Sequence, residues 1–159
     1  MPDNGVRAAA SPVAIENTET TENNETALAA FRTQSSPIVE LIGHEVTKLT
    51  EGHAQVELEV RKALTNRGGA IHGGIYCLLM DTVGGYAGVY SADPGKQRTF
   101  ITLTLTTNFL GQPKGKRMIA TGRLRAAGRS TFFSDIEIHD ELGNLLATGS
   151  GSFKYREIK

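Results

Sequence analysis

The pattern of hydrophobic and polar positions divides the chain into a hairpin, a long helix and a series of strands. Residues 54–60 alternate apolar and polar side chains, and residues 46–49 precede them across a Glu51-Gly52 turn, which indicates a hairpin. From about 72 to 90 the pattern is helical, and a helix of that length is roughly 28 Å long. Its predicted core-facing residues share a spacing of three or four: Ile71, Ile75, Leu78, Leu79, Thr82, Val83, Tyr86 and Tyr90.

Four stretches of period two follow this helix. In the first, Ile101, Leu103, Leu105, Thr107 and Phe109 alternate with polar side chains, and turns at 113–115, 127–128 and 140–144 separate the later ones. Short turns between successive strands require antiparallel neighbours, so the pattern predicts a four-stranded meander. A single helix must then cover most of one sheet face. We therefore expect an α+β fold in which an antiparallel sheet curls around one long central helix.

The N-terminal region differs from the rest of the chain. Residues 1–25 contain five Asp or Glu against Arg7 alone, and residues 16–25 have no large apolar side chain. Such a segment buries too little surface to offset chain entropy, so 1–25 is predicted to be a disordered acidic tail. Residues 26–159 would form a single domain, opened by a weak helix over 26–34 and a short helical turn after Pro37.

Composition narrows the function classes. Lys plus Arg and Asp plus Glu both number 17, and this balance argues against a nucleic-acid binder. A single cysteine, Cys77, excludes an internal disulfide and a cysteine metal cluster. His44, His53 and His139 are scattered and are interpreted as surface residues, so we expect neither a metal nor a cofactor. No apolar run approaches the ~18 residues of a membrane span, and no signal peptide is apparent, which favours a cytoplasmic protein.

The long helix contains unusual residues for a helix interior. Each internal glycine costs about 1 kcal/mol against alanine. Together with Cys77 and Asp81 the glycines form a strip of small side chains, which favours either close packing on the sheet or the approach of a ligand or second backbone. These glycines are Gly73, Gly74, Gly84, Gly85 and Gly88.

Asp81 is the only carboxylate residue between Arg67 and Asp93, and its sequence neighbours are apolar. An isolated carboxylate in this setting suits nucleophilic or general-base chemistry. At the helix start, unpaired backbone N–H groups and the helix dipole favour a polarised carbonyl or oxyanion. His72 and Asn66 beside this start are either functional or residues that order the helix entrance and the turn.

Gly73 and Asp81 are eight residues apart, or about 12 Å along one helix. An oxyanion donor and a base must both lie within roughly 3 Å of one reacting centre. The two groups therefore cannot meet within one protomer. A two-fold dimer with antiparallel helices would create two composite sites, and we expect a homodimer or a dimer of dimers.

These residues resemble hotdog-fold acyl-CoA thioesterases of the type associated with phenylacetate degradation. The similarity rests on the segment 66–74, on Leu79-Met80-Asp81 and on residues 102–110. It implies that Asp81 is the nucleophile or general base and that the Gly73 N–H binds the thioester oxygen. It further implies that Asn66 orients the thioester or water and that the Thr102 hydroxyl assists the water. His72 completes the candidate catalytic set.

The resemblance implies hydrolysis of an aryl- or medium-chain acyl-CoA without metal or cofactor. Gly74 and four arginines are the candidate substrate-binding residues, the arginines for the coenzyme A phosphates; Tyr76, Met80 and Phe109 are the candidate pocket wall. Two alternatives stay open: a hotdog enoyl-CoA hydratase or dehydratase using His72, and a non-catalytic acyl-CoA-binding protein. The four arginines are Arg67, Arg98, Arg125 and Arg129.

Overall fold

The computed structural model describes residues 36–91, 93 and 98–157. The predicted tail (1–25) and the predicted helix over 26–34 lie outside these residues. The elements, in chain order, are α2 (Pro37–Ile42), β1 (Glu45–Thr50), β2 (His53–Glu59), the 3-10 turn η1 (Lys62–Leu64), α3 (Gly73–Val89), β3 (Thr99–Phe109), β4 (Arg117–Ala127), β5 (Thr131–Asp140) and β6 (Leu145–Arg156).

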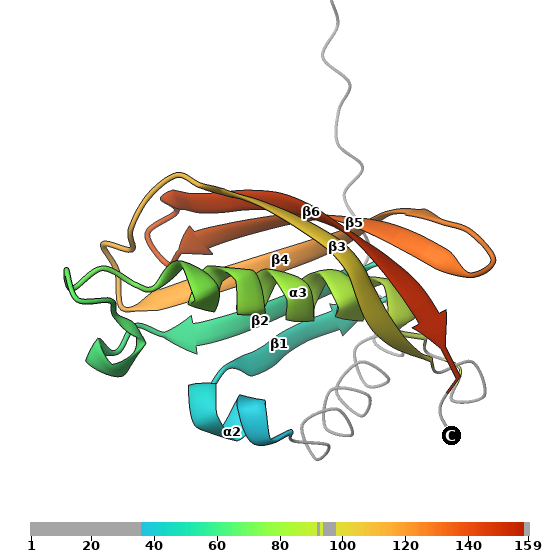
Figure 1. Ribbon diagram of the computed structural model, residues 1–159, viewed down its shortest axis with the longest axis horizontal. Helices are drawn as coiled ribbons and strands as arrows, with labels where there is room; N and C mark the ends of the chain where they lie inside the picture. Colours follow the sequence, from blue (N-terminus) through green and yellow to red (C-terminus); the bar gives the residue numbers. More distant parts are fainter. Residues whose placement is uncertain (1–35, 92, 94–97, 158–159) are drawn as a thin grey trace, which may run out of the picture.

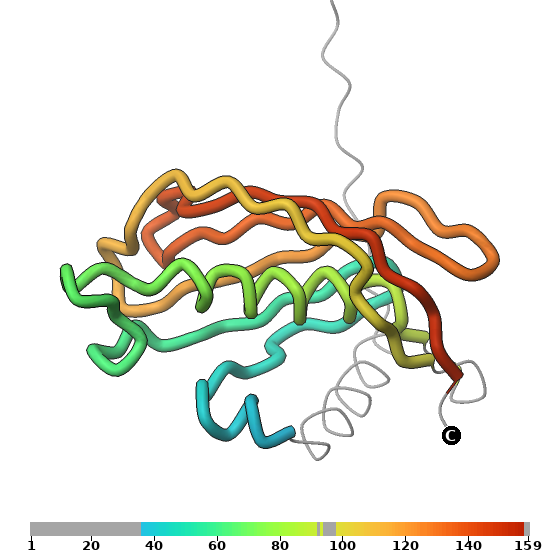
Figure 2. Tube along the Cα trace, viewed as in Figure 1, coloured from blue at the N-terminus to red at the C-terminus, as the bar shows by residue number. Residues whose placement is uncertain are grey.

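The sheet is antiparallel and has six strands in the order β1-β2-β4-β5-β6-β3. It curves around α3, which lies along its concave side (Figure 1), and the continuous trace shows the same wrapping (Figure 2). The predicted α+β hotdog architecture is therefore confirmed, as are the hairpin of β1 and β2, the turn after Pro37 and the long helix.

The predicted four-stranded meander is wrong at its first strand. Strands β4, β5 and β6 form a meander, but β3 pairs with β6 and lies at the edge of the sheet. Strand β4 pairs with β2 on one side and β5 on the other, so it has no free edge for β3. The connection over 110–116 instead crosses from one part of the sheet to the other.

The alternation predicted for β3 is also wrong in its first half. A bulge between Thr102 and Thr104 shifts the register against β6, so the strand does not keep one parity. Ile101 and Leu103 are exposed, at 44% and 52%. Thr102 instead bonds to a side chain of α3, whereas beyond the bulge Leu105 packs against the core.

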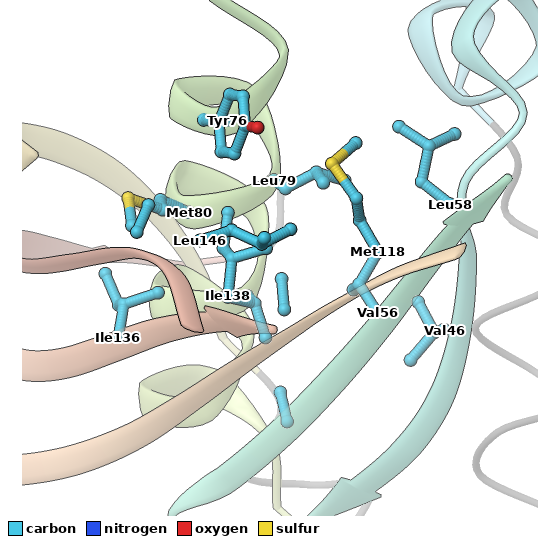
Figure 3. Packing of buried hydrophobic residues seen from close by; sticks show 14 of the residues in the cluster. Val46, Val56, Leu58, Tyr76, Leu79, Met80, Met118, Ile136, Ile138 and Leu146 are labelled. Atoms are coloured by element: carbon cyan, nitrogen blue, oxygen red, sulfur yellow. The ribbon is translucent and has the colours of Figure 1, made fainter. Parts of the chain in front are cut away.

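The core lies between α3 and the concave face of the sheet. Side chains from the helix meet the strands there, as the labelled Leu79, Met80, Ile138 and Met118 show (Figure 3). Burial reaches most of the way around the helix because the sheet wraps it. Among the residues of α3, those buried are Tyr76, Leu79, Met80, Val83, Gly84, Gly85, Ala87 and Val89.

The later glycines of α3 serve close packing on the sheet. A Cβ on Gly85 would lie 2.0 Å from the Phe100 ring, and one on Gly88 would lie 2.0 Å from the Phe132 ring. A Cβ on Gly84 would similarly clash with Ile136, at 2.7 Å. Of the two interpretations of the small-residue strip, packing therefore accounts for these three glycines.

Candidate active site

The start of α3 is fixed by its own side chains and by the preceding loop. His72 is the N-cap residue, and its Nδ1 accepts the Gly74 N–H at 2.9 Å. The Ile75 N–H donates to the His72 carbonyl at 2.9 Å. His72 therefore orders the helix entrance, as one interpretation of its sequence position proposed, and this bond commits the Gly74 N–H.

Gly73 differs from its neighbours in this turn. Its N–H has no hydrogen-bond acceptor among the described residues, whereas those of His72, Gly74 and Ile75 all have one. The Phe109 ring lies against Gly73, since a Cβ there would be 3.4 Å from its Cζ. The Gly73 N–H is thus the one first-turn donor left for an external oxygen.

Asn66 orders the loop that precedes the helix. Its Oδ1 accepts the N–H groups of Gly68 at 2.9 Å and Ala70 at 3.3 Å. Its backbone N–H donates to the Ala70 carbonyl at 2.8 Å. These bonds are those of a turn residue, and they occupy the side-chain oxygen. Asn66 is exposed.

The other half of the candidate site is a contact between α3 and the edge strand. The Thr102 hydroxyl donates to the Asp81 Oδ1 at 2.5 Å. Both residues are half-buried, so Asp81 is held against β3 but remains partly exposed. A charge-assisted bond of this length fixes the orientation of the carboxylate.

The structure gathers the candidate residues into two groups, which lie apart from each other along α3. Asn66, His72, Gly73 and Gly74 gather at the start of α3, whereas Asp81 and Thr102 meet two turns further along. The separation along the helix is about 12 Å. Within one chain the free Gly73 N–H and the Asp81 carboxylate are therefore too far apart to act on the same atom.

The four candidate arginines do not form one cluster. Arg67 lies exposed in the loop at the helix start, while Arg98 lies over the Tyr155 ring at 4.7 Å. Arg125 pairs with Asp135 at 3.3 Å on the outside of the sheet, and Arg129 is exposed in the β4–β5 turn. That turn and the start of β3 lie at the opposite end of α3 from its N-terminus (Figure 1).

Of the three predicted pocket-wall residues, only Phe109 presents surface. Tyr76 is 1% exposed and Met80 is fully buried, whereas Phe109 is 56% exposed. The Tyr76 and Phe109 rings meet edge to face, with centroids 5.8 Å apart. Tyr76 and Met80 are thus core residues, and Tyr76 supports the aromatic ring that borders Gly73.

One residue of the helix entrance was missed by sequence reasoning. The Gln112 Oε1, in the connection after β3, accepts the Ile71 N–H at 2.7 Å. The adjacent Gly111 carbonyl accepts the Tyr76 hydroxyl at 3.0 Å. Gln112 precedes Pro113, which restricts it to extended backbone. This dipeptide indicates a loop at 112–113, but nothing in the sequence predicts that Gln112 bonds to Ile71.

The interpretation of His44 as a surface residue is wrong. His44 is buried, at 4% exposed, and burial lowers the pKa of its imidazole. Burial and then the charges of Lys48 and Arg123 lower the pKa of His53.

In the described part of the chain no group of His, Cys, Asp and Glu has the arrangement of a metal site. No helix in that part has the length and apolar character to span a membrane.

The fold defines the class: a hotdog domain, here with an unbonded N–H at the start of its long helix and a carboxylate further along it. Residues 68–147 match the Thioesterase superfamily, and the chain belongs to that family. Putative esterase SSO1253 of Saccharolobus solfataricus is 32% identical over 121 residues, covering 76% of this chain and 79% of the relative. The predicted family is thereby confirmed.

Three further proteins agree with this placement, the last of them in fold alone. The 1,4-dihydroxy-2-naphthoyl-CoA hydrolase of Listeria monocytogenes is 29% identical, covering 67% of this chain and 85% of its own. The solved structure of a conserved Pseudomonas aeruginosa protein is 31% identical, with a TM-score of 0.71 over 80% of this chain and 99% of that one. The Escherichia coli PaaI protein, from a phenylacetic acid degradation operon, shares the fold at 23% identity, with a TM-score of 0.72 over 84% and 93%.

Proposed function

We propose that this protein is an acyl-CoA thioesterase that hydrolyses aryl- or medium-chain acyl-CoA thioesters to the free acid and coenzyme A. The observation that carries the proposal is the uncommitted Gly73 N–H at the start of the same helix that holds the Thr102-bonded Asp81 carboxylate. A named acyl-CoA hydrolase among the relatives supports this substrate class.

The Gly73 N–H polarises the thioester carbonyl and stabilises the tetrahedral oxyanion. As a general base, Asp81 removes a proton from water, which attacks the carbonyl carbon; collapse then expels the coenzyme A thiolate, which takes up the proton. As a nucleophile, Asp81 attacks directly, expels the thiolate and forms an anhydride that water hydrolyses. Incorporation of ¹⁸O into Asp81 during a single turnover in ¹⁸O-water would establish the nucleophilic route with water attack at the Asp81 carbonyl, because the general-base route places the label in the product acid alone.

The composite site requires two protomers, because Gly73 and Asp81 of one helix are too far apart. Pairing α3 antiparallel with its copy places the Gly73 of each protomer opposite the Asp81 of the other. The same pairing brings the Arg67 end of one protomer toward the opposite helix end of its copy. Arg98 and Arg129 stand at that end, where the coenzyme A phosphates would need cations.

Gly73→Pro removes the proposed donor with little other change. Position 73 is the first helical residue, where proline is favoured, and His72 before it has an extended backbone with φ −64° and ψ 134°, as proline requires. We expect kcat about 100- to 1,000-fold lower, measured as free thiol released from aryl- and alkyl-CoA thioesters. Gly73→Ala keeps the N–H and meets Phe109 at 3.4 Å, so it should retain activity.

Mixing two inactive variants tests the composite site. Asp81→Ala should lower kcat on the order of a thousandfold. Heterodimers of Gly73→Pro and Asp81→Ala regain one intact site, so random pairing restores about one quarter of wild-type activity. Absence of restoration in verified heterodimers would refute sites shared between protomers.

The wild-type protein distinguishes the two alternative functions. Hydration of an enoyl-CoA without thiol release would favour a hydratase, and acyl-CoA recovered unchanged would favour a binding protein.

A further inference from the structure

Gln112 reaches the helix entrance from a distant part of the chain. It lies in the connection between β3 and β4, 41 residues after Ile71, and its Oε1 accepts the Ile71 N–H at 2.7 Å. Ile71 is 3% exposed, so its N–H has little access to water and needs an acceptor within the protein. The side-chain carbonyl of Gln112 is this acceptor.

Three successive backbone N–H groups lead into the helix. The first, of Ile71, donates to Gln112; the second, of His72, donates to the Leu64 carbonyl at 2.9 Å. The third, of Gly73, has no acceptor among the described residues. Because peptide planes are rigid, fixing the first two limits the direction in which the third points.

The connection that carries Gln112 is itself well anchored. The N–H groups of Leu110 and Gly111 both donate to the Leu146 carbonyl, at 2.9 and 3.0 Å. The Gly111 carbonyl accepts the Tyr76 hydroxyl at 3.0 Å. The connection therefore holds the helix start on both sides of Gly73, at Ile71 before it and at Tyr76 after it.

We propose that Gln112 is a positioning residue that aims the Gly73 N–H at the thioester oxygen through its bond to Ile71. The inference rests on the proposed function, since it concerns the same oxyanion donor. A donor misplaced by a fraction of an ångström stabilises the tetrahedral intermediate less, while ground-state binding changes little. Gln112 thus acts on kcat through another residue and does not touch the substrate.

Gln112→Met keeps the size of the side chain but removes the acceptor. We expect kcat about 10- to 100-fold lower, with KM within about threefold, and faster hydrogen exchange at the Ile71 amide. Gln112→Glu keeps an oxygen at the same distance and should restore kcat to within about threefold of wild type. Wild-type kcat in Gln112→Met, or equal losses in the Met and Glu variants, would overturn the inference.

A double-mutant comparison separates positioning from a general structural role. In a Gly73→Pro background the donor is already absent, so adding Gln112→Met should lower kcat by less than about twofold more. An undiminished 10- to 100-fold loss in that background would contradict action through Gly73. If the wild-type protein releases no thiol from any thioester, the proposed function fails; if only the Gln112 variants behave like wild type, the inference alone fails.

Discussion

The contact between Thr102 and Asp81 determines how the candidate carboxylate is aimed. Thr102→Val removes the hydroxyl and keeps the shape, so the 2.5 Å bond to Asp81 is lost. We expect kcat about 10- to 100-fold lower with an unchanged fold, because the carboxylate then samples other orientations. Thr102→Ser keeps the hydroxyl and should stay within about fivefold of wild type in the same thiol-release assay. Wild-type kcat in Thr102→Val, or an equal loss in Thr102→Ser, which keeps the hydroxyl, would contradict a role for the hydroxyl in aiming Asp81.

A second residue-scale feature is the space that α3 leaves for the aromatic rings of the sheet. At Gly88 a Cβ would lie 2.0 Å from the Phe132 ring, which is fully buried. Although alanine favours helix, Gly88→Ala should lower Tm by roughly 5–10 °C because the ring cannot move away. Gly73→Ala, whose Cβ makes ordinary contact at 3.4 Å, should leave Tm nearly unchanged. A stabilised Gly88→Ala protein would disprove tight packing there.

At the scale of elements, local periodicity predicted the strands and the helix but not all of their partners. The edge position of β3 depends on the pairing of β4 with β2, a contact between segments about 60 residues apart that no local pattern records. The bulge at Thr102–Thr104 inserts a residue without any glycine or proline to signal it, so strict alternation assigned Ile101 and Leu103 to the wrong face.

The candidate site was predictable to the extent that it depends on one helix. Spacing along α3 was sufficient to group Gly73 with the helix start and to separate it from Asp81. It did not decide between a functional His72 and a capping one, because that choice depends on the bond from Gly74 to Nδ1. Gln112 was missed because its partner is 41 residues away.

The β5–β6 turn fixes the connection that carries Gln112. Asp140 is 1% exposed, and its carboxylate accepts the N–H groups of Lys114, Gly115, Leu142 and Asn144 and the Asn144 side-chain amide. Burial raises the pKa of Asp140, but these hydrogen bonds outweigh it and hold the pKa well below its usual range. The ionised form is therefore the one that ties the two connections together.

Asp140→Asn tests this link by its dependence on pH. A folded-state pKa below the unfolded value, about 3.9, gives stability that is present above that value and lost as pH falls through the folded pKa. At pH 7 the variant should unfold roughly 5–10 °C below wild type. The difference should shrink as the pH is lowered below about 4, as thermal melts followed by circular dichroism would show. A constant difference across this range would contradict an ionised Asp140.

At the scale of the whole molecule, the proposed sharing of each site between two protomers predicts which residue lies at the two-fold axis. In a two-fold pair that places each Gly73 opposite the partner's Asp81, the residue midway between them on the same face lies near the axis and meets its own copy. That residue is Cys77, one turn from each, half-buried beside Thr107 at 3.8 Å. The only cysteine of the chain therefore reports on the register of the proposed dimer.

Oxidation by copper phenanthroline, or a short bismaleimide, should link two protomers of the wild-type protein through Cys77. The product would migrate as a dimer on a denaturing gel, because no second thiol is present in the chain, and Cys77→Ser should abolish it. Native mass spectrometry of the untreated protein supplies the oligomeric state independently. A dimer in solution that resists both reagents would place the helices in another register, and a monomer with full thioesterase activity would contradict the shared site altogether.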